Sequence, residues 1–161
     1  MYLRAEDLYV AAYPRLVRIL TAAAGDSQEA EDVVQEAFVR LLSRWRRVSS
    51  YDDPEAWVRL VAFRLLSNRA RRARLKLASA GQAGSASSAA TDAVHASVDM
   101  SRALAALPPV QRHAVVLHHV LGLSVEEVAT TLRIPVGTVK SRLSRGRRAL
   151  APLLVSQEEV A

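Results

Sequence analysis

The chain has 161 residues, a formal net charge of +6 and no cysteine, which excludes disulfide frameworks, thiolate metal sites and cysteine nucleophiles. No stretch approaches the ~18 apolar residues of a membrane span, and Arg4, Glu6 and Asp7 are incompatible with a signal peptide. Half of the residues are apolar and only 5% are aromatic. We therefore expect a soluble, cytoplasmic and mostly helical protein, whose excess of arginine favours a polyanionic partner.

Three helices are predicted before position 78. An apolar stripe indicates the first helix, which ends at Gly25. Asp26 is a cap for the second helix, with Glu29 in capping-box spacing, and apolar residues at helical period continue to Trp45. The segment from position 46 to position 53 is the loop that leads to the third helix.

The third predicted helix changes character along its length. It begins at Asp53 and Pro54, because proline is favoured at the first helical position. Up to Leu66 it is apolar on nearly every side, as a central buried helix is. Beyond Leu66 it becomes polar and basic, with Asn68, Arg69, Arg71, Arg72, Arg74 and Lys76.

Residues 78–98 consist mainly of alanine, serine and glycine. We interpret this segment as a flexible linker, because it has too little apolar bulk to repay the entropy of ordering it. The alternative is an alanine-rich helix, against which Gly81 and Gly84 argue. The predicted organisation is therefore a domain at 1–77, a linker at 78–98 and a domain at 99–155. All eight aromatic residues lie in the first domain, so only that domain can stack side chains on unpaired bases.

Four shorter helices are predicted after the linker, at 99–107, 110–121, 124–132 and 136–150. Ser124 and Glu127 form a capping box at the start of the third. The turn Arg133-Ile134-Pro135 then leads directly into the last helix. Two short helices joined by so tight a turn, the second strongly basic, predict a helix-turn-helix.

The outward face of the last predicted helix is basic. A helix fits the DNA major groove, where Arg and Lys pair with guanine and Ser and Thr bind either bases or phosphates. The alternative is a solvated amphipathic face, but such faces usually mix charges, and residues 140–148 contain no acidic residue. We predict that Thr138 to Arg142 lie deepest in the groove and that the later arginines follow the phosphates. The predicted DNA-binding residues are Thr138, Lys140, Ser141, Arg142, Arg145, Arg147 and Arg148.

Two segments resemble a known family. Asp26-Ser-Gln-Glu-Ala-Glu-Asp-Val-Val-Gln-Glu-Ala-Phe resembles the region 2 signature of extracytoplasmic-function sigma factors, a group of the bacterial sigma-70 family. Residues 123–129 and 134–147 resemble region 4 of the same family. Trp45-Arg-Arg-Val and Asp53-Pro-Glu-Ala-Trp are similar to the sigma-E-like subgroup of actinobacteria. The resemblance implies an all-α fold in which a three-helix region 2 and a four-helix region 4 are joined by a flexible linker.

The resemblance also implies a subunit that binds core RNA polymerase and directs promoter-specific initiation of transcription. In the family, region 2 docks on the clamp helices of the largest polymerase subunit and region 4 on the flap of the second largest. Transferred by motif, the region 2 contact falls on Asp32, Gln35 and Glu36, which lie opposite the apolar stripe of their helix. The alternative for Glu36 is an intrahelical ion pair with Arg40, four residues away.

Promoter melting at the -10 element is implied for the loop after the second helix and for the basic part of the third. The residues concerned are Tyr51, Arg64, Asn68, Arg69, Arg71 and Arg72. An arginine-lined groove can hold a separated strand, and Tyr51 can stack on a base. Packing of Tyr51 on the helical core is an equal alternative. Arg64 stands where many relatives carry asparagine. Region 4 is implied to recognise the -35 element.

No cofactor, metal site or enzymatic activity is predicted. The four histidines have no cysteine partners, and His118 and His119 face different ways on a helix. The sequence contains no glycine-rich phosphate loop and no nucleophile motif. The main alternative function is a two-domain transcriptional regulator that does not use polymerase, and a further one is a pure interaction module. An anti-sigma factor is a possible partner by family resemblance, and no membrane partner is expected.

Overall fold

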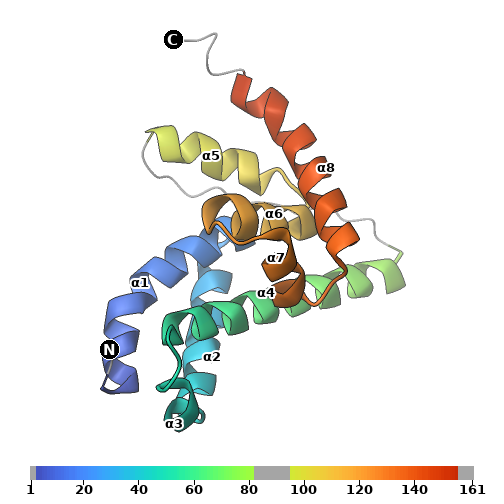
Figure 1. Cartoon of the computed structure of the whole chain (residues 1–161). Helices are drawn as coiled ribbons and strands as arrows, with labels where there is room; N and C mark the ends of the chain where they lie inside the picture. Colours follow the sequence, from blue (N-terminus) through green and yellow to red (C-terminus); the bar gives the residue numbers. More distant parts are fainter. Residues whose placement is uncertain (1–2, 82–94, 156–161) are drawn as a thin grey trace.

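The computed structural model describes residues 3–81 and 95–155 (Figure 1). These residues form helices and no strand, which confirms the predicted all-α fold, and none of the helices is long and apolar enough to cross a membrane. The elements are α1 (Ala5–Ala24), α2 (Ser27–Leu42), α3 (Trp45–Val48), α4 (Pro54–Ser79), α5 (His95–Ala105), α6 (Pro109–Val115), the π-helix η1 (Val116–Val120), α7 (Val125–Leu132) and α8 (Val136–Val155).

The helix boundaries before residue 81 follow the local sequence signals. Gly25 ends α1 in the left-handed conformation (φ 74°), and the Asp26 side chain accepts a hydrogen bond from the Gln28 N–H at 2.9 Å. Asp53 caps α4 in the same way. The capping box predicted for Glu29 does not form, because the Glu29 side chain is half-buried, and this burial raises its pKa. The loop predicted after α2 begins with one helical turn, α3.

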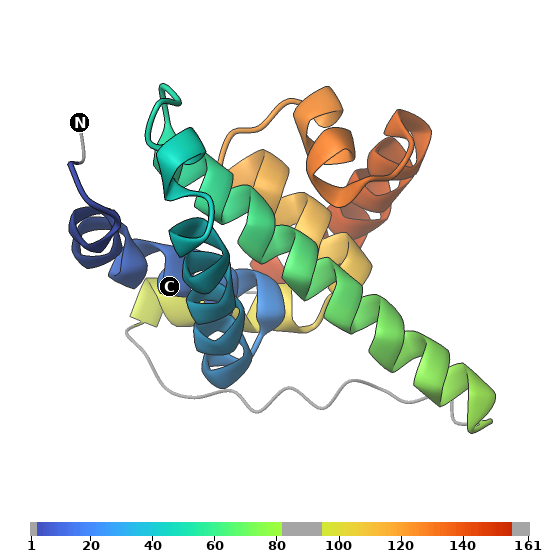
Figure 2. The same cartoon turned by 90° about the horizontal axis from the view of Figure 1, so that it is seen from below.

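Helix α4 is the longest element and divides into two parts. Its first half is buried through residues that include Val58, Phe63 and Leu66, and it packs against α1 and α2. An ion pair between Arg15 of α1 and Glu55 holds its start. From Arg71 to Ser79 it is exposed, and this end projects past the other helices (Figure 2). The predicted change from a buried to a basic, exposed helix is therefore confirmed.

The residues from 95 onward form a second helical block around α6 and α8. Val139, Leu143 and Leu150 of α8 are buried, and Val136 is half-buried. The helix predicted at 110–121 instead divides into α6 and a π-helical turn, in which the Leu121 N–H donates to the Val116 carbonyl at 3.1 Å. Gly122 (φ 72°) ends this segment. The capping box at Ser124 forms in full.

The N-terminal block (residues 3–81) and the C-terminal block (residues 95–155) pack directly against each other. Helix α1 contacts α5 and α6, and α4 contacts α6 and α7 (Figures 1 and 2). The sequence did not indicate this packing. Of the linker predicted at 78–98, the ends are helical, since α4 continues to Ser79 and α5 begins at His95. Residues 82–94 lie outside the described part of the chain.

Gly146 marks the closest approach between α8 and α6. A Cβ atom at Gly146 would lie 2.7 Å from Val115 Cγ2, whereas one at Gly137, in the same helix, would meet nothing within 4 Å. Val115 is β-branched and buried, so its methyl group has little freedom to move. The absence of a side chain at Gly146 therefore allows α8 to pack closely against Val115 of α6.

We predict opposite effects of alanine at the two glycines of α8. Gly137→Ala should raise the free energy of unfolding by up to ~1 kcal/mol, because alanine is the better helix former. Gly146→Ala should lower it by ~1–3 kcal/mol, the usual cost of overpacking a core. Urea unfolding measures both changes, and Val115→Ala should restore the Gly146→Ala variant. A stabilised Gly146→Ala variant would show that the helices separate without cost.

Candidate protein-binding and nucleic-acid interfaces

The polar face of α2 carries Asp32, Gln35 and Glu36, the residues predicted to contact polymerase. The buried residues of this helix, which include Val33 and Ala37, lie on the opposite side. The Asp32 carboxylate accepts a hydrogen bond from the Gln28 amide at 3.1 Å, and the Gln35 amide donates to the Tyr13 hydroxyl at 3.4 Å. Asp32 and Gln35 are exposed and Glu36 is half-buried, so this face is available to a partner.

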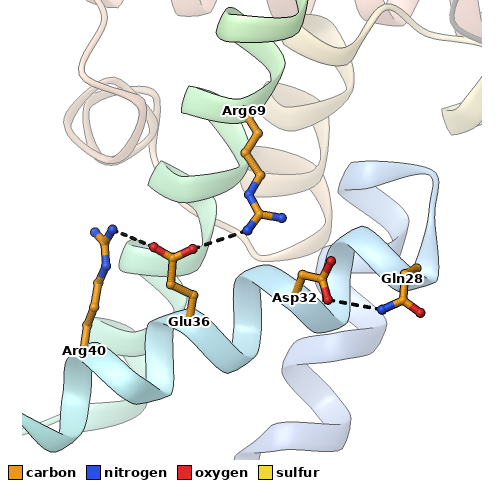
Figure 3. A network of polar contacts seen from close by, with 5 residues as sticks. All are labelled: Gln28, Asp32, Glu36, Arg40 and Arg69. Atoms are coloured by element: carbon orange, nitrogen blue, oxygen red, sulfur yellow. Dashed lines mark hydrogen bonds and ion pairs between the residues drawn. The ribbon is translucent and has the colours of Figure 1, made fainter.

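Glu36 is shared between two arginines (Figure 3). Its Oε1 is 2.7 Å from Arg40 Nη2 in the same helix, and its Oε2 is 3.3 Å from Arg69 Nη2 in α4. The intrahelical alternative raised by the sequence is thus formed, together with a contact that spans 33 residues and that the sequence did not predict. Glu36 therefore links the polar face of α2 to the basic half of α4.

An apolar groove between α1 and α2 adjoins this face. Val10, Val39 and Leu42 are 76%, 65% and 61% exposed, although all three are aliphatic. Gln35 belongs both to the groove and to the polar face, so the two surfaces are continuous. Helical spacing alone misses this groove, because it lies beside the apolar stripes and not opposite them. Its lining residues are Ala5, Glu6, Tyr9, Val10, Gln35, Phe38, Val39 and Leu42.

The six residues predicted for the -10 element have different environments. Asn68, Arg71 and Arg72 lie on the exposed half of α4, where the Asn68 side-chain oxygen accepts from Arg71 at 3.4 Å. Arg69 turns toward Glu36. Tyr51 follows α3 and is 38% exposed, which leaves its ring accessible. The structure therefore leaves four of the six exposed, and the remaining two, Arg64 and Arg69, contact groups of the chain itself.

Arg64 contacts the C-terminal block. Its Nε–H donates to the Thr131 carbonyl and its Nη2 to the Thr130 carbonyl, both at 3.2 Å. These carbonyls lie at the C-terminal end of α7, where backbone oxygens lack helical partners and the helix dipole is negative. Burial lowers the pKa of Arg64, and the nearby Arg133 lowers it further. No sequence pattern could have predicted that this arginine would contact the helix-turn-helix.

Helices α7 and α8 form the predicted helix-turn-helix. Arg133 ends α7 in the left-handed conformation (φ 56°), a position that usually requires glycine, and the Ile134 N–H donates to the Ala129 carbonyl at 3.1 Å. This turn directs α8 away from α7. On α8, Lys140, Arg145, Arg147 and Arg148 are exposed, whereas Thr138, Ser141 and Arg142 are half-buried.

Arg142 lies near the projecting half of α4. Burial lowers its pKa, and the charge of Arg74 lowers it further. The Ser141 hydroxyl donates to the Thr138 carbonyl at 3.1 Å, which leaves its oxygen able to accept. The first two turns of α8 and the end of α4 therefore form one strongly basic region of the surface.

The histidines do not form a metal site within the described residues, where no three potential ligands come together. His118 Nδ1 lies 2.7 Å from the Leu123 carbonyl, a contact that closes the turn after the π-helix. His113 is buried beside Arg112 and Arg142. Burial, followed by these two charges, lowers its pKa to about 3, so the ring is neutral in the folded protein.

Both blocks match models of one protein family. The model for sigma-70 region 2 matches residues 8–76, and the model for sigma-70 region 4 matches residues 97–150. Similar curated proteins include the ECF RNA polymerase sigma factor SigE of Mycolicibacterium smegmatis, 34% identical over 87% of this chain and 57% of SigE. SigM of Mycobacterium tuberculosis is 30% identical over 92% of this chain and 76% of SigM. The chain thus spans a little over half of SigE.

Solved structures show the same fold. The sigma factor RpoE of Bartonella quintana, in complex with the anti-sigma factor NepR, aligns with a TM-score of 0.70 and 24% identity over 92% of this chain and 95% of that one. CnrH in complex with the cytosolic domain of CnrY aligns with a TM-score of 0.56 and 24% identity, over 94% and 88%. A helical region 2 followed by a region 4 with a helix-turn-helix defines the class, the sigma-70 factors of bacterial RNA polymerase. Within that class, the chain belongs to the extracytoplasmic-function (ECF) group.

We predict that acid destabilises the protein through His113. In the unfolded chain this histidine binds a proton near pH 6.5, and in the folded chain only near pH 3. Its neutral, buried state therefore contributes stability above pH 6.5 that is lost as the pH falls toward 3, by ~1.4 kcal/mol per pH unit. Urea unfolding at several pH values measures this slope, and His113→Leu should reduce it. An unchanged slope in that variant would assign the acid sensitivity to other groups.

Proposed function

We propose that this chain binds core RNA polymerase through its N-terminal block and directs it to promoters through both blocks. The observation that carries the proposal is the separation of surfaces. One surface on α1 and α2 is apolar and polar-acidic, and a different one on α4 and α8 is basic. A protein that bound only DNA would have no use for the first surface, and a pure interaction module would have no use for the second.

The polymerase contact is proposed for Asp32, Gln35 and Glu36, together with the adjoining groove. Exposed aliphatic side chains beside carboxylates suit a protein helix that offers apolar residues and a basic residue, whereas duplex DNA would be repelled by the carboxylates. We assign this partner as the clamp helices of the largest subunit, with the flap of the second largest as the partner of the C-terminal block. An anti-sigma factor is a further proposed partner, and the RpoE and CnrH structures are of complexes with such regulators.

Recognition of the -35 element is proposed for the helix-turn-helix. Thr138, Lys140, Ser141 and Arg142 lie on the first turns of α8, which enter the major groove when such a motif docks. Arg145, Arg147 and Arg148 lie further along the helix, where arginines contact phosphates and set the register. The exposure of Lys140 and of the three later arginines supports this division.

Recognition and melting of the -10 element are proposed for the exposed half of α4 and for Tyr51. Asn68, Arg71 and Arg72 offer hydrogen-bond donors and positive charge along one projecting helix. Tyr51 offers an accessible ring on which an unpaired base can stack, a contact worth ~1–3 kcal/mol. We propose region boundaries at 1–77 and 99–155, a cytoplasmic location, and no catalytic activity of the chain itself.

The alternative of a regulator that does not use polymerase is not favoured. Such a protein would share the helix-turn-helix, but its N-terminal block would bind a ligand or another protein. Residues 8–76 match sigma-70 region 2, and this match assigns the N-terminal block to the sigma family.

Run-off transcription with purified core polymerase tests the proposal. The chain should direct specific transcripts from a library of genomic promoter fragments that core polymerase alone does not produce. Glu36→Gln removes the charge at the proposed polymerase contact and should weaken association with core by about tenfold, ~1.4 kcal/mol. Glu31→Gln, which lies about 100° around the same helix from Asp32, is the control and should have the smaller effect. If core with the chain produced no specific transcript, the proposed function would be wrong.

Two arginines of α8 should differ in how they affect DNA binding. Arg142→Ala should relax specificity at one base pair of the upstream element, at a cost of ~1–3 kcal/mol for the preferred base. Arg148→Ala should weaken binding about equally for all sequences and reduce the slope of log affinity against log salt by ~1. Binding to a library of duplexes at several salt concentrations separates the two effects. Equal losses of specificity in both variants would contradict the assignment.

A further inference from the structure

Arg112 lies at the centre of the contact between the two blocks. It belongs to α6, is only 5% exposed, and reaches the C-terminal end of α1 in the other block. Its Nε–H donates to the Ala23 carbonyl at 2.6 Å, and its Nη2 donates to the Ala24 carbonyl at 2.9 Å. Its Nη1 donates to the carbonyl of Ala105, the last residue of α5, and to that of Leu107, two residues later, both at 3.4 Å. One guanidinium therefore binds the C-terminal carbonyls of helices from both blocks.

Gly25 provides the space for this guanidinium. A Cβ atom at Gly25 would lie 3.2 to 3.5 Å from the three terminal atoms of the Arg112 side chain. Gly25 also has a φ of 74°, which places it at the end of α1, where Ala23 and Ala24 expose their carbonyls. The glycine thus serves two purposes, since it ends the helix and it admits the arginine of the other block.

Arg64 forms the second contact of this type, through the carbonyls of Thr130 and Thr131 at the end of α7. Both contacts connect a cationic side chain of one block to the negative end of a helix in the other. Arg64 is also a residue proposed to bind the -10 element. In the packed arrangement, its Nε–H and one N–H of Nη2 are bound to these carbonyls, so DNA can reach these two donors only when α7 moves away.

The charges around these contacts oppose the packing. The charge of Arg133 lowers the pKa of Arg64, and the charge of Arg74 in α4 lowers the pKa of Arg142 in α8, so like charges repel across the blocks. A buried arginine also regains water when the blocks separate, which reduces the cost of separation compared with an apolar side chain. Residues 82–94 span up to ~45 Å when extended, so the covalent connection permits separation. These features favour a contact between the blocks that can break.

From these observations we propose that Arg112 and Gly25 hold the two blocks in a closed state, in which Arg64 is withheld from DNA. Breaking the Arg112 contact opens the blocks and releases Arg64 together with the surface of α7. This inference rests on the proposed function only for the role of Arg64. The closed state and its dependence on Gly25 are properties of the chain alone.

The distance between the blocks tests the closed state. The chain contains no cysteine, so Ser43→Cys and Ser101→Cys, both at exposed positions, allow one spin label on each block. Pulsed electron paramagnetic resonance should show one short distance in the parent. Gly25→Ala should add a population with a longer distance between the labels and raise the ratio of open to closed molecules about tenfold. Arg112→Gln should have the same effect. Gly122→Ala is the matched control, because Gly122 has a φ of 72° but no atom within 4 Å of its added Cβ.

The comparison of the two alanine variants decides the first part of the proposal. Gly25→Ala and Gly122→Ala carry the same backbone strain, and only the first crowds Arg112. Thermal unfolding of each variant verifies that both blocks are folded, which matters most for Arg112→Gln, since Arg112 also contacts carbonyls of its own block. If Gly25→Ala and Gly122→Ala gave the same distance distribution, Arg112 would not hold the blocks together.

Binding of a short, mixed-sequence single-stranded DNA tests the role of Arg64. Fluorescence anisotropy should show that Gly25→Ala binds this DNA about 3- to 10-fold more tightly than Gly122→Ala, because a larger fraction of the molecules is open and able to bind. Adding Arg64→Ala to Gly25→Ala should remove the gain. If the gain in DNA affinity persisted in the variant without Arg64, the proposal that the closed state withholds Arg64 from DNA would be wrong. Neither measurement uses polymerase, so an absence of transcription would contradict the proposed function and leave the distance result unaffected.

Discussion

The structure depends on the burial of the first half of α4, which is enclosed on several of its faces by other helices. This half packs against α1 and α2 within its own block and against α6 and α7 of the other block. Because Val58, Phe63 and Leu66 are fully enclosed, α4 cannot rotate or slide without exposing core. The position of the projecting basic half is therefore fixed by the packing of the apolar half. The functional surfaces of both blocks are likewise placed relative to a single long helix.

This arrangement explains how one small chain keeps opposite kinds of surface apart. The acidic and apolar surface lies on α1 and α2, on one side of α4, and the helix-turn-helix lies on the other side. Glu36 and Arg69 connect the first surface to α4, whereas Arg64 connects α4 to α7. A partner that binds the α2 face therefore meets a side chain that also contacts the basic helix. The two surfaces are separate in position but share α4 as a common support.

Much of the fold could be predicted from local sequence, since helix caps and apolar periods act over a few residues. Asp26, Asp53 and the Ser124 capping box mark helix starts correctly, and Gly25 and Gly122 mark helix ends. The π-helical turn at 116–120 could not be predicted, because its apolar pattern also fits an α-helix. The roles of Arg64 and Arg112 depend on packing between segments 66 to 89 residues apart, and no periodicity reports such contacts. Of the candidate sites, the basic face of α8 and the polar face of α2 could be found from helical spacing, whereas the groove beside α2 could not.

The hydrogen bonds of Arg64 and Arg112 across the blocks share one chemical property, which is that every acceptor is a main-chain carbonyl. A carbonyl is present whichever side chain occupies its position. Substitutions at residues 23, 24, 130 and 131 can therefore accumulate during evolution without any compensating change at the two arginines. Methods that detect contacts from correlated substitutions would find no signal for these arginine contacts, even in a large alignment. Selection on these contacts would act on the two arginines themselves and on Gly25, which makes room for Arg112.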